Sequence, residues 1–168
     1  LQSLINELPI KTCLEIGSGE GYLVDDLIAI KPKIQIVGSD IDYSIVRHAK
    51  TSRLSAEWCV LNGDNLPFRG DAYDLILACE VLEHVKNPTN VLSELHRVCS
   101  KYIIISVPYE PIWRILNMVR LKYLKDFGNT PGHINHWSKN SIQNLVGQYL
   151  HTINMQTSFP WIFIQAIK

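Results

Sequence analysis

The chain has 168 residues, which is enough for one domain with its own hydrophobic core. Its sixteen basic residues equal its sixteen acidic residues, so it has no overall positive charge for nucleic acid, and we expect a small-molecule substrate instead. The four cysteines lie mostly within apolar runs, which predicts buried free thiols in a reducing compartment. Because no apolar run reaches membrane-spanning length and no signal-peptide pattern opens the chain, we expect a cytoplasmic protein.

Segments typical of strands and of helices alternate along the chain. Apolar runs predict strands at 11–17, 34–40, 56–64, 73–80, 102–108, 151–159 and 161–168. Helical spacing and breakers predict helices at 21–30, 43–54, 87–99 and 141–150, the third with Asn87 as N-cap and Pro88 at its first position.

Strands separated by helices need crossover connections, which give a parallel sheet with helices on both faces. The last two strands have no helix between them, so they should pair as an antiparallel hairpin. We therefore expect one α/β domain over residues 1–168: a doubly wound, Rossmann-like, mostly parallel sheet of seven strands with an antiparallel last strand.

Three glycines, Gly17, Gly19 and Gly21, follow the first predicted strand at alternate positions. Glycines this dense indicate a turn against which a ligand lies, at the strand end where such sheets bind ligands. A nucleoside triphosphate would need a P-loop lysine, but residues 15–30 contain no lysine or arginine. A nicotinamide dinucleotide prefers G-x-G-x-x-G, whereas Tyr22 stands here in place of the last glycine.

Acidic residues follow the second and third predicted strands. Asp40 closes the second strand, where its carboxylate could accept hydrogen bonds from both ribose hydroxyls and would repel a 2′-phosphate. Asp64 closes the third strand and could accept from an adenine amino group, with Ile41 and Leu66 as apolar walls for the ring. Together with Glu15, these acids suit a cofactor without phosphates that carries a positive centre, such as S-adenosylmethionine.

Four stretches of the chain, LEIGSGEGYL, VGSDID, LNGDNLPFRGDAYDLILACEVLEHV and LHRVCSKYIIISVP, resemble successive motifs of class I S-adenosylmethionine-dependent methyltransferases. Within that class they are most similar to type 11, which contains the ubiquinone and menaquinone biosynthesis methyltransferases. The resemblance implies these cofactor contacts: the amino-acid part on Glu15 and Gly17, the ribose on Asp40, the adenine on Asp64 and Asn65, and the methionine end on Cys79 or Glu80.

Glu80, Glu83 and His84 stand at i, i+3 and i+4, so a helical turn would place all three on one face. They could hold magnesium or manganese, which would bind vicinal oxygens of a catechol, a diol or an RNA ribose during O-methylation. Alternatively, His84 alone takes the acceptor's proton, or Glu80 binds the cofactor while His84 packs locally. We take His84 as the candidate catalytic base and the metal as the alternative.

The segment 108–137 is inserted between the fifth strand and the last helix, where it should lie over the mouth of the cofactor site. With four basic and two acidic residues it carries a net charge of +2. We interpret it as a substrate lid whose helix includes Trp113 and Leu121, with Trp113, His133 and His136 facing the acceptor; the alternative is a helix that only packs on the domain. Such a lid suits an anionic or amphipathic acceptor and could also rest on a membrane surface.

The sequence therefore predicts an enzyme that transfers a methyl group from S-adenosylmethionine to oxygen or carbon of a small-molecule acceptor. Such an enzyme acts mainly by holding the nucleophile in line behind the methyl carbon. Metal-assisted O-methylation is the alternative enzymatic activity, and a non-catalytic binding module with the same fold is the alternative from another class.

Overall fold

Seven strands form one sheet in the computed structural model, which describes residues 2–53 and 55–168. The strands are β1 (Thr12–Ile16), β2 (Gln35–Asp40), β3 (Glu57–Val60), β4 (Tyr73–Cys79), β5 (Cys99–Pro108), β6 (His151–Ser158) and β7 (Trp161–Ile167). The helices are α1 (Gln2–Ile5), α2 (Tyr22–Ile30), α3 (Tyr43–Ser52), α4 (Pro88–Val98), α5 (Ile112–Val119) and α6 (Lys139–Val146), and a 3₁₀ turn, η1, spans Leu124–Asp126.

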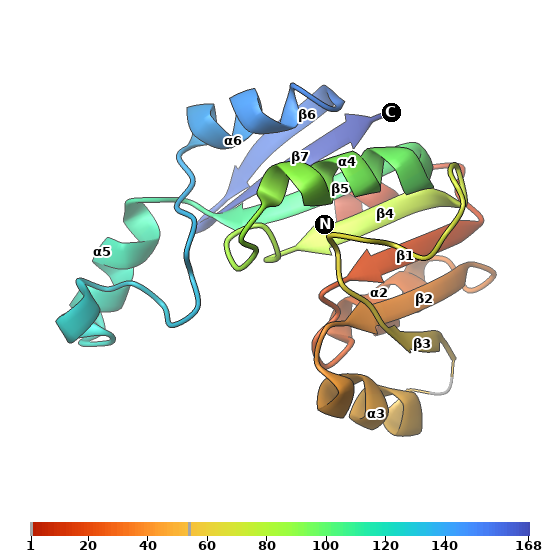
Figure 1. Ribbon diagram of the computed structural model, residues 1–168, viewed down its shortest axis with the longest axis horizontal. Coiled ribbons are helices and arrows are strands. Elements are labelled where there is room, and N and C mark those ends of the chain that lie inside the picture. The colour runs from red at the N-terminus through yellow and green to blue at the C-terminus, as the bar shows by residue number, and fades with distance from the viewer. Residues whose placement is uncertain (1, 54) are drawn as a thin grey trace.

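The strands lie in the order β3-β2-β1-β4-β5-β7-β6 (Figure 1). All neighbours from β3 to β5 are parallel, and β7 is antiparallel to both β5 and β6. The predicted mostly parallel sheet of seven strands is therefore confirmed. The last strand in the chain, β7, is antiparallel as predicted, and it lies between β5 and β6, which leaves β6 at the edge of the sheet.

Both faces of the sheet are covered by helices. Along β4, Leu75 and Leu77 belong to a core cluster with side chains of α1, α2 and α3, whereas Ile76 and Ala78 belong to a second cluster with α4 and α6. All four side chains are completely buried. This burial on two faces explains why the parallel strands read as almost continuous apolar runs.

The predicted element boundaries hold where local chemistry sets them. The Asn87 side chain accepts a hydrogen bond from the backbone N–H of Asn90 and caps α4, with Pro88 at the first position as predicted. The third strand is shorter than the predicted 56–64, since the chain leaves the sheet after Val60. The predicted helix 43–54 ends at Ser52, and Leu54 lies outside the described residues.

Residues 108–137, which we expected to form a lid and call the lid segment below, project from the sheet with α5 as their largest element (Figure 1). Among the described residues, no side chain of α5 belongs to either core cluster. The helix also ends at Val119, short of the predicted Leu121, because Leu121 adopts a left-handed conformation with φ 56°. None of the described helices is both long and apolar enough to span a bilayer.

Candidate active site

A crevice of about 640 Å³ lies where β1, β2, β3 and β4 end. This edge of a doubly wound sheet is where such folds bind ligands. The residues that line the crevice are Ile16, Gly17, Asp40, Ile41, Leu61, Asn62, Gly63, Asp64, Glu80, Val81, His84, Val85 and Lys86.

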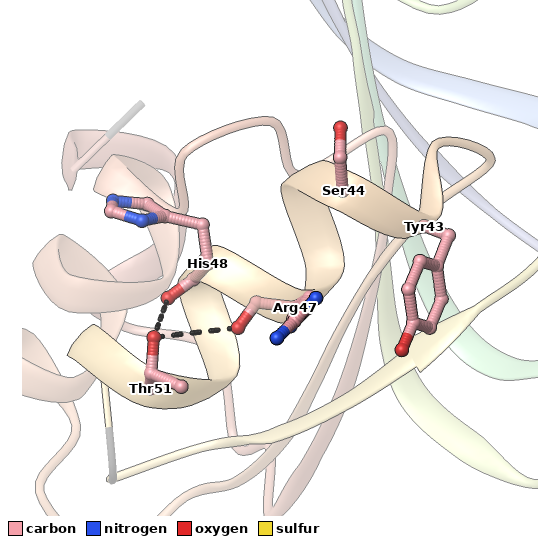
Figure 2. Close-up of a pocket in the computed structure, with 5 residues that line it drawn as sticks. All are labelled: Tyr43, Ser44, Arg47, His48 and Thr51. Carbon is pink, nitrogen blue, oxygen red and sulfur yellow. Dashed lines mark hydrogen bonds between the residues drawn. The ribbon is translucent and has the colours of Figure 1, made fainter.

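A second hollow lies on the surface of α3 and differs in kind from the crevice. All five residues that line it, Tyr43, Ser44, Arg47, His48 and Thr51, come from this one helix (Figure 2). The Thr51 hydroxyl donates to the backbone carbonyls of His48 and Arg47, so its hydrogen bonding is satisfied within the helix. Ligand sites bring polar groups together from several elements, so we place the functional site at the crevice.

The glycine-rich turn after β1 combines packing constraints with open space. A Cβ atom on Gly17 would lie 2.6 Å from Val81 Cγ2, so the packing of the turn itself requires this glycine. Gly19 has a φ of +52°, and apart from its neighbours in the chain no atom of the described residues lies within 4 Å of the position its Cβ would take. Backbone and side-chain hydrogen bonds between Ser18 and Ser39 tie the turn to the end of β2. The open side of the turn at Gly19 is where a ligand could approach the backbone.

The Asp40 carboxylate is already positioned by backbone groups. Its Oδ2 accepts from the N–H of Gly19 at 3.1 Å, and its Oδ1 accepts from the N–H of Asp42 at 3.0 Å. A carboxylate offers about four acceptor positions, so about two remain for a ligand. That number matches the two hydroxyls of a ribose.

Two further carboxylates have buried oxygens without partners. Asp64 Oδ1 and Glu15 Oε2 are both buried, and neither has a hydrogen-bond partner among the described residues. Burial raises the pKa of Glu15 to about 8, with a smaller opposing effect from Ser18. Buried acceptors normally find partners, so these two oxygens fit a ligand that donates hydrogen bonds or carries positive charge. A sulfonium nucleoside with an amino group has both properties.

Several predicted cofactor residues do not line the crevice. Leu66 is only 2% exposed and packs in the core, and its backbone N–H donates to Glu94 Oε2. The Leu66 wall that we expected is therefore absent from the crevice, where Val81 and Leu61 provide apolar lining instead. The other predicted cofactor residues outside the lining are Glu15, Gly19, Gly21, Asn65 and Cys79.

Burial affects the chemistry of Cys79, and packing restricts Gly21. Burial raises the pKa of the Cys79 thiol to about 12, so the thiol stays protonated at neutral pH. A Cβ on Gly21 would lie 2.5 Å from the ring of Trp58, so packing against that ring requires this glycine. Sequence reasoning missed Asn62, Gly63 and Lys86, although the Asn-Gly pair directly before Asp64 is a turn signal that could have revealed two of them.

The segment after β4 forms turns, so the predicted helical face of Glu80, Glu83 and His84 is wrong. Glu80 has a left-handed conformation with φ 57° and lines the crevice. Glu83 is fully buried, and in the described structure neither of its carboxylate oxygens has a hydrogen-bond partner. Burial raises the pKa of Glu83 to about 8.

The returning chain of the lid segment, residues 133–136, binds directly to this turn. The backbone carbonyl of Glu83 accepts from the N–H groups of Ile134 and Asn135, at 2.9 and 3.1 Å. The Asn135 side chain donates to the carbonyls of Leu82 and Val85. Residues some fifty positions apart in sequence are therefore held side by side at the crevice.

These contacts bring His133 to His84. The two rings meet edge to face with centroids 4.8 Å apart, and His84 Nδ1 lies 3.0 Å from the carbonyl oxygen of Gly132. Burial lowers the pKa of His133 to about 4, so this imidazole is neutral at physiological pH. Trp113 stacks on His133 with a centroid separation of 6.5 Å.

Of the three residues predicted to face the acceptor, His133 contacts His84 and Trp113 stacks on His133, whereas His136 lies beside Glu110. His136 Nδ1 lies 3.8 Å from Glu110 Oε1. Glu83, His84 and His133 each offer one ligand atom within 4.8 Å of the others, and this set does not include Glu80.

Comparison with known proteins identifies relatives of this chain. A malonyl-[acyl-carrier protein] O-methyltransferase of Legionella pneumophila is 31% identical over 88 residues, which cover 51% of this chain and 31% of the relative. The mitochondrial arginine-hydroxylase NDUFAF5 of Danio rerio is 24% identical over 139 residues, which cover 80% of this chain and 43% of that protein. The chain thus spans less than half the length of these curated relatives.

The fold is also that of a solved structure described as a SAM-dependent methyltransferase from Methanosarcina mazei, with a TM-score of 0.78 and 22% identity over 99% of this chain and 96% of that one. The family model described as "Methyltransferase domain", type 11, matches residues 14–104, which is more than half of the chain. This match contains β2 to β4, the turns that line the crevice, and most of β1 and β5. The chain therefore belongs to the type 11 methyltransferase-domain family.

Proposed function

We propose that this chain transfers a methyl group from S-adenosylmethionine to a small-molecule acceptor. The observation that carries the proposal is the crevice itself, in which Asp40 keeps acceptor positions free and Asp64 has an unpartnered oxygen. Asp40 would hold the ribose and Asp64 the adenine, with Ile41 and Val81 as apolar lining. Glu15, buried beneath the glycine turn, would face the positively charged amino-acid end of the cofactor.

When bound, the cofactor supplies an electrophilic methyl group, and the chain must position a nucleophile and remove its proton. His84 is the candidate for the second task. A carbonyl oxygen can only accept a hydrogen bond, so the contact with Gly132 favours the proton on Nδ1 and leaves the Nε2 lone pair free. His84 lines the crevice, so Nε2 could take the proton of an acceptor hydroxyl there.

Oxygen is the acceptor atom that we favour. The Legionella relative is named as an O-methyltransferase, and a hydroxyl or carboxyl acceptor suits a site with an imidazole base. Lys86 also lines the crevice and would attract an acceptor with negative charge.

The four cysteines are free thiols, which supports a reducing location such as the cytoplasm.

Metal-assisted O-methylation is the second candidate, and the cluster of Glu83, His84 and His133 favours it. Metal bonds of about 2.2 Å need ligand atoms within about 4.4 Å of one another, so this cluster has to close only slightly. Two imidazoles and one carboxylate suit zinc or iron better than the magnesium expected from two carboxylates. If this candidate is right, a chelator abolishes turnover and zinc restores it; undiminished activity in the chelator excludes it.

Titration with S-adenosylhomocysteine, followed by calorimetry, tests the proposed function. Both enzymatic candidates require binding, so the absence of binding refutes both. A mass-spectrometric screen of extracted metabolites for methylated products then separates an enzyme from a binding module. This step is needed because one relative is named as an arginine hydroxylase, which shows that methyl transfer is not the only activity named among the relatives.

A further inference from the structure

The lid segment exposes a group of large apolar side chains, here called the apolar tip and defined as residues 119–127. Every residue of the tip is exposed, including Leu121 at 77% and Phe127 at 73%. The large apolar members of the tip are Val119, Leu121, Tyr123, Leu124 and Phe127. Soluble proteins rarely expose so many neighbouring apolar side chains unless the surface binds something.

The backbone of the tip is ordered in a way that keeps these side chains outside. Leu121, Tyr123 and Phe127 all have left-handed conformations, with φ between 51° and 56°. Bulky residues rarely adopt this conformation, because it brings the Cβ atom too close to the following carbonyl oxygen. The guanidinium of Arg114 donates to the carbonyls of Asp126 and Phe127 and holds the tip against α5. The structure therefore keeps a strained loop whose apolar side chains face solvent.

Basic residues alternate with the apolar ones. The tip contains three basic residues and one acidic residue, so it carries a net charge of +2, whereas the net charge of the whole chain is zero. These residues are Arg120, Lys122, Lys125 and Asp126. The charge is therefore concentrated beside the apolar side chains. Lysine is depleted at the centres of protein–protein interfaces, whereas apolar side chains flanked by lysine and arginine are typical of segments that lie in the interface of anionic membranes.

We propose that the apolar tip docks on an anionic phospholipid bilayer, with its apolar side chains among the headgroups and its lysines against lipid phosphates. Figure 1 shows α5 and the residues that follow it projecting away from the sheet and its covering helices, so the tip could meet a flat surface. The proposal does not depend on methyl transfer, since it rests on residues outside the crevice.

Sedimentation of the full chain with vesicles tests the proposal. Wild-type protein should pellet with vesicles of phosphatidylcholine mixed with phosphatidylglycerol, pellet much less with phosphatidylcholine alone, and be released by salt. The double variant Leu121→Asn/Phe127→Asn should weaken binding about thirty-fold, the value of half-burying two large side chains. Lys122→Gln/Lys125→Gln should weaken it about fivefold for each charge.

The asparagine variant separates docking from folding, because asparagine tolerates a positive φ better than leucine or phenylalanine. Its melting temperature should equal or exceed that of the wild type. Ile153→Asn, on edge strand β6, and Lys33→Gln are matched exposed controls that should bind vesicles as the wild type does. The proposal fails if the wild-type protein does not pellet with the anionic vesicles, and binding of the tip to another protein would not rescue it. It also fails if the asparagine variant binds the vesicles as the wild type does, or if that variant unfolds.

Discussion

Replacing Asp40 with asparagine is the sharpest test of the cofactor site. In asparagine one carboxylate oxygen is replaced by an NH2 group that can only donate, and the Gly19 and Asp42 N–H groups bond to different oxygens of Asp40, so one of them loses its acceptor. One ribose hydroxyl then has no acceptor, and the bond to the other hydroxyl is no longer strengthened by charge. The lost bond to a charged group is worth about 2 kcal/mol and the weakened bond about 1 kcal/mol, so the change costs about 3 kcal/mol. The Kd for S-adenosylhomocysteine should therefore rise about 150-fold.

Asp42→Asn is the matched control for this experiment. Asp42 is two residues away and caps α3 through the N–H of Ser44, a task that asparagine performs equally well, and it does not line the crevice. Isothermal titration calorimetry of both variants measures the Kd, and thermal unfolding checks that both are folded. Equal affinities for the two variants would refute the placement of the ribose on Asp40.

Three further predictions concern the turn, the buried acid and the base. Gly17→Ala should lower stability by about 1–3 kcal/mol in thermal unfolding, because its Cβ meets Val81, whereas Gly19→Ala should cost less stability but more cofactor affinity. The pKa of Glu83 is raised from 4.5 to about 8 in the folded state, so its contribution to stability is lost as pH rises towards 8. The melting temperature should therefore fall between about pH 4.5 and 8, and Glu83→Gln should reduce that slope; an unchanged slope contradicts the buried, protonated acid. His84→Asn, which retains a donor for Gly132, should lower kcat about 10²–10⁴-fold with unchanged S-adenosylhomocysteine affinity, and normal turnover would remove His84 as the base.

The sequence predicted those parts of the fold and the crevice that depend on local patterns. Apolar runs predicted the strands, and Asn87 and Pro88 predicted the start of α4. Asp40 lines the crevice from the end of β2 as expected, and Asp64 lines it from the turn after β3. These inferences succeed because parallel strands bring their carboxyl ends to one edge whatever the details of side-chain packing.

Contacts between distant segments could not be predicted in the same way. The pairing of His84 with His133 depends on how the lid segment returns across the turn after β4, and this return is set by backbone hydrogen bonds to Glu83. Leu66 was misplaced because a leucine after a strand suits a crevice wall and a core position equally well. The helical face of Glu80, Glu83 and His84 failed because spacing alone does not make a helix.

The family match ends at residue 104, four residues before the lid segment begins. The part of the chain that would recognise the methyl donor and the segment that would choose the recipient thus follow one another in sequence, and hydrogen bonds to the turn after β4 connect them. Exchanging residues 108–137 between members of this family should then redirect an enzyme to a new recipient without rebuilding its donor pocket. The graft would need to keep an asparagine at position 135, whose side-chain amide donates to the carbonyls of Leu82 and Val85 in that turn.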